Sequence, residues 1–374
     1  MRKLKRTALC LCLALVLTLT GVGPTLNGVH PTLTGVVTAE AATGKIDKMV
    51  KGMSLNEKVG QMFLADCPTD AQKWAKTYQL GGYVLFARDF ENETPASVKK
   101  TIGGYQSVSK IPMLITVDEE GGTVTRVSRY KAFRSSKFAS PQEVYKAGGA
   151  DAIRADVREK AKLLKALGVN VNLAPVADVP TSANSFIYGR SFGTDPKLTG
   201  KYVAAVVKES KKAGLGSVLK HFPGYGDNGD THTGIAVDAR PLSTFKKRDI
   251  LPFKAGIEAG APAILVSHNI VKSIDPKRPA SLSLKMHKLL RDNLDFNGVV
   301  MTDDLAMGAI TEAYGQAEAA VMAVQSGNDM LITEDFRTGI DAVLKAVKSG
   351  RIKESRIDVS VRRILEWKRQ LGLI

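Results

Sequence analysis

Residues 217–238, SVLKHFPGYGDNGDTHTGIAVD, run from a short apolar segment directly into a loop crowded with glycine and ionisable side chains. A second segment of similar construction, residues 298–310, reads GVVMTDDLAMGAI. In both, a run typical of a buried strand ends at residues that can carry chemistry. The two segments together predict strands whose carboxyl ends bring catalytic groups to one face of a barrel.

Eight such apolar runs occur along the chain, at residues 61–64, 83–86, 113–117, 169–173, 217–219, 263–266, 299–301 and 329–332. Amphipathic stretches lie between most of them, including residues 151–167, 201–213, 284–293 and 317–326. Strands that alternate with helices favour a parallel sheet, and eight such units favour a closed barrel over an open sheet. We therefore predict the α/β class and a single (β/α)8 barrel of the TIM type.

Each of the eight runs is followed by a polar or ionisable residue. In chain order these are Asp66, Arg88, Asp118, Asp178, Lys220 with His221, Ser267 with His268, Asp303 with Asp304, and Glu334. This is the pattern of the active-site face of a barrel, where catalytic groups come from the ends of several strands. A capping-box pattern at residues 54–57 marks the start of the folded unit, and residues 362–373 read as a last helix.

The first 41 residues are typical of a signal peptide, because a basic start, MRKLKR, precedes an apolar stretch too short for a membrane span. Ala39-Glu40-Ala41 supplies the small-x-small cleavage pattern. We expect residues 1–41 to be removed, residues 42–374 to form a single catalytic barrel domain, and the product to be secreted or associated with the cell wall. No membrane span is expected after processing. The exported chain keeps only Cys67, so no intramolecular disulfide can form.

The chain carries a formal net charge of +16. Loss of four basic residues and Glu40 with the leader leaves about +13. For an exported protein this charge favours attraction to anionic cell-wall polymers, although a merely soluble basic surface is the alternative. No basic tract interleaved with aromatic residues is present, so nucleic acid is not an expected partner. We expect a monomer.

His232 stands two residues after Asp230 in the glycine-rich loop. This spacing lets the carboxylate hold the imidazole in one tautomer and raise its basicity, while the glycines suit a loop that closes over a substrate. Asp227, Asp230, His232 and His221 could alternatively ligate a metal. Of the other histidines, His268 follows a strand, and His287 lies in a helix that reads as surface-exposed.

Asp303 follows the seventh run at a position where its carboxylate can reach the barrel centre. We expect Asp304 to point elsewhere, since adjacent strand residues alternate in direction, and to cap a helix that begins at Leu305. Asp303 is therefore the candidate nucleophile.

Four motifs in order carry a resemblance to a known family. They are residues 117–122, VDEEGG, with Arg126; residues 189–193, GRSFG; residues 220–224, KHFPG, continuing to Asp230 and His232; and residues 302–305, TDDL. Over nearly all of residues 42–374 the chain resembles the family 3 glycoside hydrolases, and within them the bacterial β-N-acetylglucosaminidases (β-hexosaminidases).

The resemblance implies a retaining, two-step hydrolysis of terminal β-linked N-acetylglucosamine from peptidoglycan-derived oligosaccharides. In it, Asp303 attacks the anomeric carbon, and His232 with Asp230 serves as acid and base. The implied sugar-binding residues are Asp118, Arg126, Arg190, Lys220 and His221. A histidine with an ordinary pKa near 6.5 can act as both acid and base at about neutral pH. The resemblance implies no cofactor and no metal.

Two departures from the family pattern affect the loop: Tyr225 stands where many relatives carry a second histidine, and Thr231 stands where serine is common. These changes leave the identity of the leaving group open. Three other functions remain: a β-glucosidase of the same family, a metal-dependent barrel hydrolase, and a non-catalytic wall-binding protein. Phosphate could also replace water as the acceptor, because a histidine does not repel an anion as a carboxylate does.

Overall fold

The computed structural model describes residues 44–231 and 234–374, and Gly44–Ile374 form one compact unit. The leader expected at residues 1–41, as well as His232, lies outside the described residues. Eight parallel strands form the main sheet: β1 (Phe63–Asp66), β2 (Gly82–Leu85), β3 (Leu114–Val117), β4 (Val171–Asn172), β5 (Gly216–Phe222), β7 (Ala263–Val266), β9 (Val299–Thr302) and β10 (Leu331–Thr333). Each coincides with one of the eight predicted runs to within a few residues.

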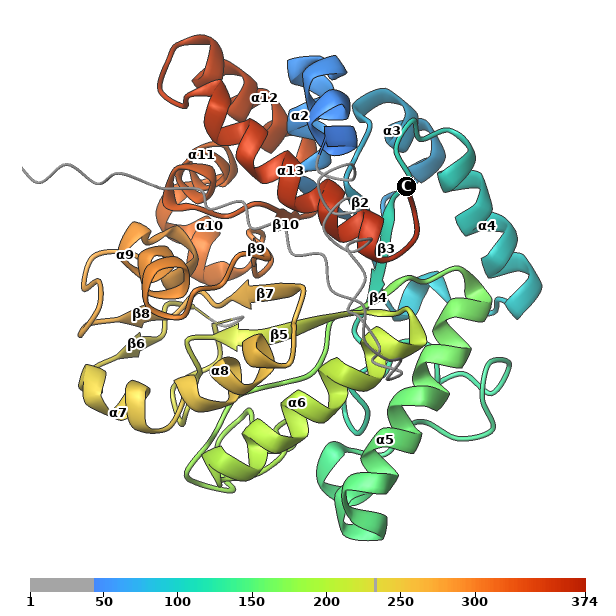
Figure 1. The fold of residues 1–374 in the computed structure, drawn as a ribbon, viewed down its shortest axis with the longest axis vertical. Coiled ribbons are helices and arrows are strands. Elements are labelled where there is room, and N and C mark those ends of the chain that lie inside the picture. The colour runs from blue at the N-terminus through green and yellow to red at the C-terminus, as the bar shows by residue number, and fades with distance from the viewer. Residues whose placement is uncertain (1–43, 232–233) are drawn as a thin grey trace, which may run out of the picture. The chain divides into compact units, whose positions relative to one another are not determined.

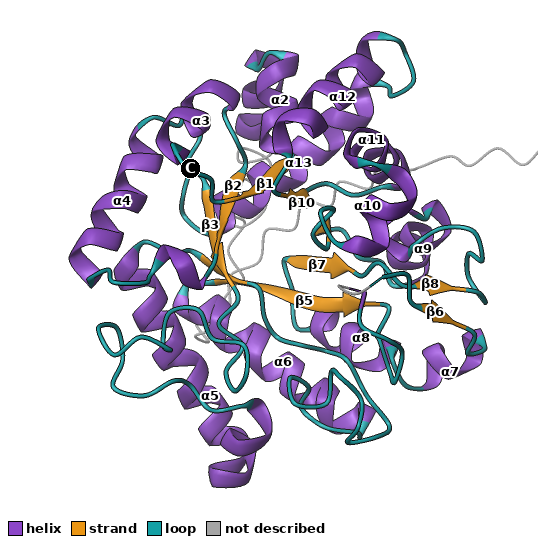
Figure 2. Ribbon diagram, turned by 180° about the vertical axis from the view of Figure 1, so that it is seen from behind, coloured by secondary structure: helices purple, strands orange, loops and turns teal. Residues whose placement is uncertain are grey.

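The sheet follows the order β10-β1-β2-β3-β4-β5-β7-β9. A parallel bridge between Met301 and Met330 brings its two outer strands together, and the Thr302 amide donates to the Met330 carbonyl at 3.1 Å. Helices surround the strands (Figures 1 and 2). The predicted (β/α)8 barrel is therefore confirmed. The strand residues are almost all buried, as expected where helices cover a parallel sheet.

The helices of the outer layer are α2 (Leu55–Gln61), α3 (Ala71–Tyr78), α4 (Pro95–Ser107), α5 (Pro141–Leu167), α6 (Pro196–Ala213), α7 (Leu242–Lys247), α8 (Ile250–Glu258), α9 (Leu284–Lys288), α10 (Gly308–Tyr314), α11 (Gln316–Ser326), α12 (Phe336–Lys348) and α13 (Glu354–Gln370). The described residues also include two short 3-10 turns, η1 (Ala87–Asp89) and η3 (Ala280–Leu282), and a π-helical turn, η4 (Leu289–Asn293). Within residues 44–231 and 234–374, no helix combines the length and apolar character needed to cross a membrane.

The predicted helix start is confirmed. The Ser54 side chain accepts from the Glu57 amide at 3.3 Å, and the Glu57 carboxylate accepts from the Ser54 amide at 2.9 Å. These two bonds satisfy amide groups that the first turn of α2 cannot pair internally. At the other end of the chain, α13 packs its buried Trp367 close to Gly216, where any side chain would approach the indole ring. The closing helix begins at Glu354, earlier than residue 362.

A small parallel sheet outside the barrel was not predicted. It pairs β6 (Val237–Asp238) with β8 (Ile270–Val271). Each strand contains only two residues, and β6 is half exposed, so neither leaves a clear apolar run in the sequence. The pair joins the end of the glycine-rich loop to the segment after β7.

Candidate active site

A cavity of about 360 Å³ lies at the carboxyl ends of the barrel strands, within the range of about 300–1,000 Å³ typical of small-molecule sites. It brings together six of the residues singled out in the sequence: Asp118, Arg126, Arg190, Lys220, His221 and Asp303. Apolar walls come from residues such as Phe86, Leu173, Leu265, Met307 and Ile332. Polar groups that converge in a partly apolar hollow are what a sugar site requires, since sugar rings carry hydroxyls on apolar carbon faces.

Three residues that line this cavity, Asp118, Lys220 and Arg190, form one connected ion network with Glu120. The Lys220 ammonium contacts the carboxylates of Asp118 and Glu120, the latter at 2.6 Å. Glu120 also accepts from two nitrogens of the Arg190 guanidinium, at 3.0 Å and 2.8 Å. Acid and base thus alternate across β3, β5 and the loop that carries Arg190.

The network keeps Glu120 and Lys220 ionised despite their burial. Burial alone would raise the pKa of Glu120, but Arg190 and Lys220 outweigh it and hold that pKa well below the ordinary value. Burial alone would likewise lower the pKa of Lys220, yet Asp118 and Glu120 raise it above the ordinary value. The charges are therefore fixed at neutral pH, and they can hold sugar hydroxyls in one orientation.

His221 is oriented by two partners. Its Nε2 lies 3.3 Å from Arg190 Nη2, and its Nδ1 lies 2.7 Å from Asp178 Oδ2. Because a guanidinium only donates, Nε2 accepts and Nδ1 donates, which assigns the tautomer. Asp178 is fully buried and also accepts from the amide of Tyr225 at 2.8 Å.

Tyr225 connects this wall to the loop that leads to His232. Its ring lies edge-on to His221, with centroids 5.2 Å apart, and its hydroxyl lies 2.6 Å from the Thr231 hydroxyl. Burial, and next the Asp303 carboxylate, raise the pKa of Tyr225 well above its ordinary value, so the phenol keeps its proton. Tyr225 thus ties Thr231 to the wall that carries His221.

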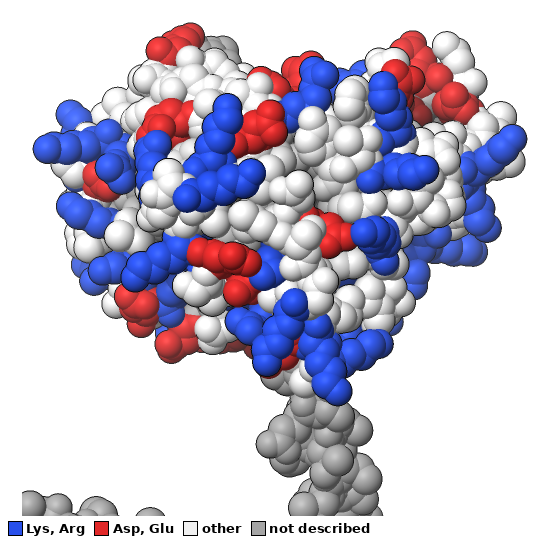
Figure 3. All heavy atoms as spheres, turned by 90° about the horizontal axis from the view of Figure 1, so that it is seen from above, with Lys and Arg blue, Asp and Glu red and all other residues white. Residues whose placement is uncertain are grey.

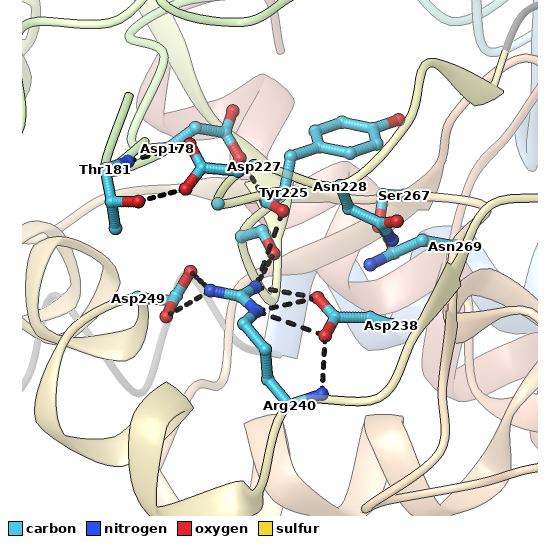
Figure 4. Close-up of polar contacts among 12 residues, drawn as sticks. Asp178, Thr181, Tyr225, Asp227, Asn228, Asp238, Arg240, Asp249, Ser267 and Asn269 are labelled. Atoms are coloured by element: carbon cyan, nitrogen blue, oxygen red, sulfur yellow. Dashed lines mark hydrogen bonds and ion pairs between the residues drawn. The ribbon is translucent and has the colours of Figure 1, made fainter. Parts of the chain in front are cut away.

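Arg240 anchors the base of the same loop (Figure 4). Its guanidinium donates to Asp238 at 2.7 Å and to Asp249 at 2.9 Å, and it reaches the carbonyls of Gly224 and Tyr225 at 3.3 Å and 3.4 Å. A side chain at position 226 would meet the guanidinium at 2.3 Å, and the backbone there has φ of +56°, so glycine is required. Both roots of the loop are therefore tied to one cation.

Glu119 shapes the segment that presents Arg126. Its carboxylate accepts from the amides of Arg126 and Val127 at 2.9 Å and 2.8 Å, and it also bonds the Ser128 hydroxyl. Arg126 lines the cavity, and its Nε is buried without a hydrogen-bond partner among the described residues. A buried donor without a partner is costly, so this atom is a candidate to donate to a ligand.

The two aspartates after β9 differ from the sequence prediction. The Asp303 amide donates to the Val266 carbonyl at 2.9 Å, which fixes the residue at the strand end. Asp304 also lines the cavity, so the expectation that it points elsewhere is wrong; the strand ends at Thr302, and its alternation does not continue. Nor does Asp304 cap a helix: its carboxylate accepts from the Ala306 amide at 2.8 Å, and α10 begins only at Gly308.

Two histidines have roles that the sequence did not reveal. His268 does not line the cavity; its Nε2 lies 2.8 Å from the Asp304 carbonyl and its Nδ1 lies 2.7 Å from the Ser281 hydroxyl. His287, which was expected at the surface, is only 2% exposed, and its Nδ1 lies 2.8 Å from the Ser283 carbonyl. Gly327 packs against its ring, which explains the error, because that contact comes from another helix end.

The metal alternative names Asp227, Asp230, His232 and His221 as ligands. Among residues 44–231 and 234–374, no three His, Cys, Asp or Glu side chains gather as they would around a metal ion. Asp227 instead accepts from the amides of Thr181 and Ser182, at 2.8 Å and 3.1 Å, and so holds a neighbouring loop (Figure 4). His232 lies outside the described residues.

The sequence identified most of the cavity but missed its supporting residues. Glu119 and Glu120 lie inside the motif at residues 117–122, but no role was predicted for them, and no role was predicted for Arg240. The signal available for the two glutamates was their place directly after a buried strand. No local pattern marks Arg240, since its partners lie up to 16 residues away.

Comparison with known proteins relates the chain to one family of glycoside hydrolases. Residues 54–367 match the description of the glycosyl hydrolase family 3 N terminal domain. The chain is 30% identical over 330 residues to the beta-hexosaminidase LpqI of Mycobacterium tuberculosis, covering 84% of this chain and 83% of that protein. It is 34% identical over 262 residues to a beta-hexosaminidase of Xanthomonas campestris pv. campestris, covering 69% and 78%.

A solved structure shows the same likeness in three dimensions. It is a glycoside hydrolase family 3 beta-N-acetylglucosaminidase from Paenibacillus sp. str. FPU-7, with a TM-score of 0.80 and 32% identity. The match covers 86% of this chain and 63% of that one, so this chain spans less than two thirds of the longer protein.

Proposed function

This chain belongs to glycosyl hydrolase family 3, and from that membership we propose that it is a retaining, exo-acting β-N-acetylglucosaminidase. Its substrates would be peptidoglycan-derived oligosaccharides that end in β-linked N-acetylglucosamine. The observation that carries the proposal is the cavity that Asp303 lines together with Asp118, Lys220 and Arg190, which are joined by ion pairs directly or through Glu120. The names of the similar proteins support the sugar that is proposed.

In the first step, the Asp303 carboxylate forms a bond to the anomeric carbon while the glycosidic carbon–oxygen bond breaks. His232, as an imidazolium, gives its proton to the departing oxygen. In the second step, the neutral imidazole takes a proton from water, whose oxygen attacks the anomeric carbon and releases Asp303. Each step inverts the centre, so the product keeps the β configuration.

The residues around His232 support this assignment although His232 itself is outside the described residues. Thr231, the residue before it, bonds the buried Tyr225, and Arg240 ties both roots of the loop. Asp230, two residues earlier, is the proposed partner that holds the imidazole and stabilises its charged form.

Azide rescue of two variants tests the roles directly. In Asp303→Ala, azide should enter from the vacated side and give the α-glycosyl azide. In His232→Ala, azide should attack the glycosyl-enzyme and give the β-glycosyl azide. The same azide anomer from both variants, or no rescue of either, would contradict the two-step assignment.

The substrate is tested with a pair of chromogenic glycosides. The enzyme should hydrolyse 4-nitrophenyl N-acetyl-β-glucosaminide and leave the corresponding β-glucoside largely intact. Preference for the glucoside would favour the β-glucosidase alternative. Loss of hydrolysis after exhaustive EDTA treatment, restored by a divalent metal, would favour the metal-dependent one.

Product analysis on disaccharide muropeptides, with and without phosphate, settles the natural substrate and the acceptor. We expect free N-acetylglucosamine in both conditions. Appearance of N-acetylglucosamine 1-phosphate would instead show that phosphate replaces water.

We further propose that the basic surface holds the enzyme at anionic wall polymers. Lys and Arg side chains are spread over the face drawn in Figure 3, with acidic side chains among them. Such charge attracts polyanions without a specific site and is screened by salt. The purified protein should adsorb to isolated walls at low ionic strength and be released as salt rises; adsorption that salt does not weaken would contradict the proposal.

A further inference from the structure

Asp66, the last residue of β1, borders two cavities. It lines the catalytic cavity, and it also lines a second cavity of about 510 Å³ formed with Arg88, Glu334 and Arg337. Among the described residues it is the one that lines both. No sequence motif assigned it a role in sugar binding.

The carboxyl group of Asp66 is buried yet lacks a complete set of partners. The residue is 8% exposed, and its Oδ1 has no hydrogen-bond partner among residues 44–231 and 234–374. A buried polar atom of this kind is rare in folded proteins because it forfeits its bond to water. Because Asp66 lines the cavity, a bound ligand can supply the hydrogen-bond partner that its Oδ1 lacks.

The groups that face Asp66 are mostly carboxylates from other strand ends. Burial is the largest influence on its pKa, and Asp304 after β9 is the next. Glu334 after β10 and Asp118 after β3 act in the same direction, while Arg88 in η1 opposes them. Together they raise the pKa of Asp66 to about 8.

We propose that Asp66 presents a carboxylic acid, not a carboxylate, to the sugar in the cavity at the strand ends, and donates a hydrogen bond to a sugar oxygen there. This rests on the proposed function for the identity of the sugar only. A sugar that enters displaces the water around Asp66, which further penalises the charged form. Binding therefore favours the protonated form and weakens once the proton is lost.

Isothermal titration with N-acetylglucosamine from pH 6 to pH 9 tests the proposal without depending on turnover. For the wild type, Kd should be flat at low pH and rise toward tenfold per pH unit above about pH 8. Asp66→Asn keeps a neutral donor of the same shape, so its Kd should stay within about threefold of the wild type and lose the rise. Asp66→Ala should bind about tenfold more weakly at pH 7.

Glu334→Gln is the matched control, because it removes a neighbouring negative charge from the second cavity and leaves Asp66 in place. It should keep the rise in Kd but move its onset to lower pH. Thermal unfolding checks that each variant is folded. If Asp66→Ala does not fold, the pH dependence of Kd in Asp66→Asn is sufficient to test the proposal.

Two results would overturn the inference: an unchanged rise in Asp66→Asn, or wild-type affinity in a folded Asp66→Ala. Failure of the proposed function looks different. If the wild type binds glucose and not N-acetylglucosamine, the sugar assignment is wrong, and the same pH series with glucose decides the role of Asp66.

Discussion

The cavity at the carboxyl ends of the strands has two walls on which charged side chains are arranged differently. On the wall formed by β3, β5 and the Arg190 loop, Asp118, Lys220 and Arg190 are joined by ion pairs directly or through Glu120, and these pairs keep Glu120 and Lys220 ionised. On the wall formed by the ends of β1 and β9, Asp66, Asp303 and Asp304 bring carboxylates together. Alternation fixes protonation and orientation, whereas crowding makes protonation responsive to the environment. One barrel end thus combines a wall of paired charges, here called the rigid wall, with a wall of clustered carboxylates, here called the reactive wall, to which the proposed mechanism assigns the nucleophile.

The largest expected effect separates the two aspartates of the reactive wall. Asp303→Ala should lower kcat on 4-nitrophenyl N-acetyl-β-glucosaminide by at least about a thousandfold, because in the proposed mechanism Asp303 forms the glycosyl-enzyme. Asp304→Asn, its adjacent control, should lower kcat by no more than about fiftyfold. A larger loss in Asp304→Asn than in Asp303→Ala would reverse the assignment of the nucleophile.

Breaking the rigid wall should cost stability. Lys220→Met leaves Asp118 and Glu120 beside each other without the buried cation between them, and the free energy of unfolding should fall by about 3–5 kcal/mol. Lys212→Met removes an exposed lysine that pairs with Glu209 at 2.9 Å, and should change the free energy of unfolding by less than about 1 kcal/mol. Urea denaturation measures both free energies. Equal losses would show that the buried network stabilises the fold no more than an exposed ion pair does.

Because Glu120 belongs to this ion network, we expect the free energy of unfolding to depend on pH. The pKa of Glu120 lies below its ordinary value of 4.5 in the folded protein, so its contribution is fully present above about pH 4.5 and is lost as the pH falls below it. Glu120→Gln should be less stable than the wild type at pH 7, and this difference should narrow as the pH falls. The free energy of unfolding of Glu91→Gln, an exposed control, should follow that of the wild type at every pH. If the difference in free energy of unfolding between Glu120→Gln and the wild type stays constant with pH, the result would argue against the network.

The smallest expected effect concerns the link between the rigid wall and the loop that leads to His232. Tyr225→Phe removes one hydroxyl bond to Thr231, which is worth about 1 kcal/mol. We expect kcat to fall several-fold with KM little changed, since the loop is affected and the sugar-binding groups are not. Tyr145→Phe, at an exposed tyrosine, should leave both constants unchanged. A rise in KM alone would indicate a role in sugar binding.

Much of the fold could be predicted because its signals are local. Apolar runs bounded by polar residues identified all eight barrel strands, and the capping box identified the start of α2. The two-residue strands β6 and β8 escaped because they are too short to show a period. Asp304 was misplaced because strand alternation was extended two residues beyond the end of β9.

By itself, the sequence determined the barrel class, the family and the residues that meet at the strand ends, because periodicity and motif spacing are carried by neighbouring positions. Tertiary structure alone decided which charges pair. Glu120 lies between Lys220 and Arg190 only because β3 and β5 end at one rim, and Asp66 gains carboxylate neighbours only because β10 and β9 close the barrel beside β1. Burial and charge at a site depend on residues distant in the chain, and the closed register of the strands brings them together.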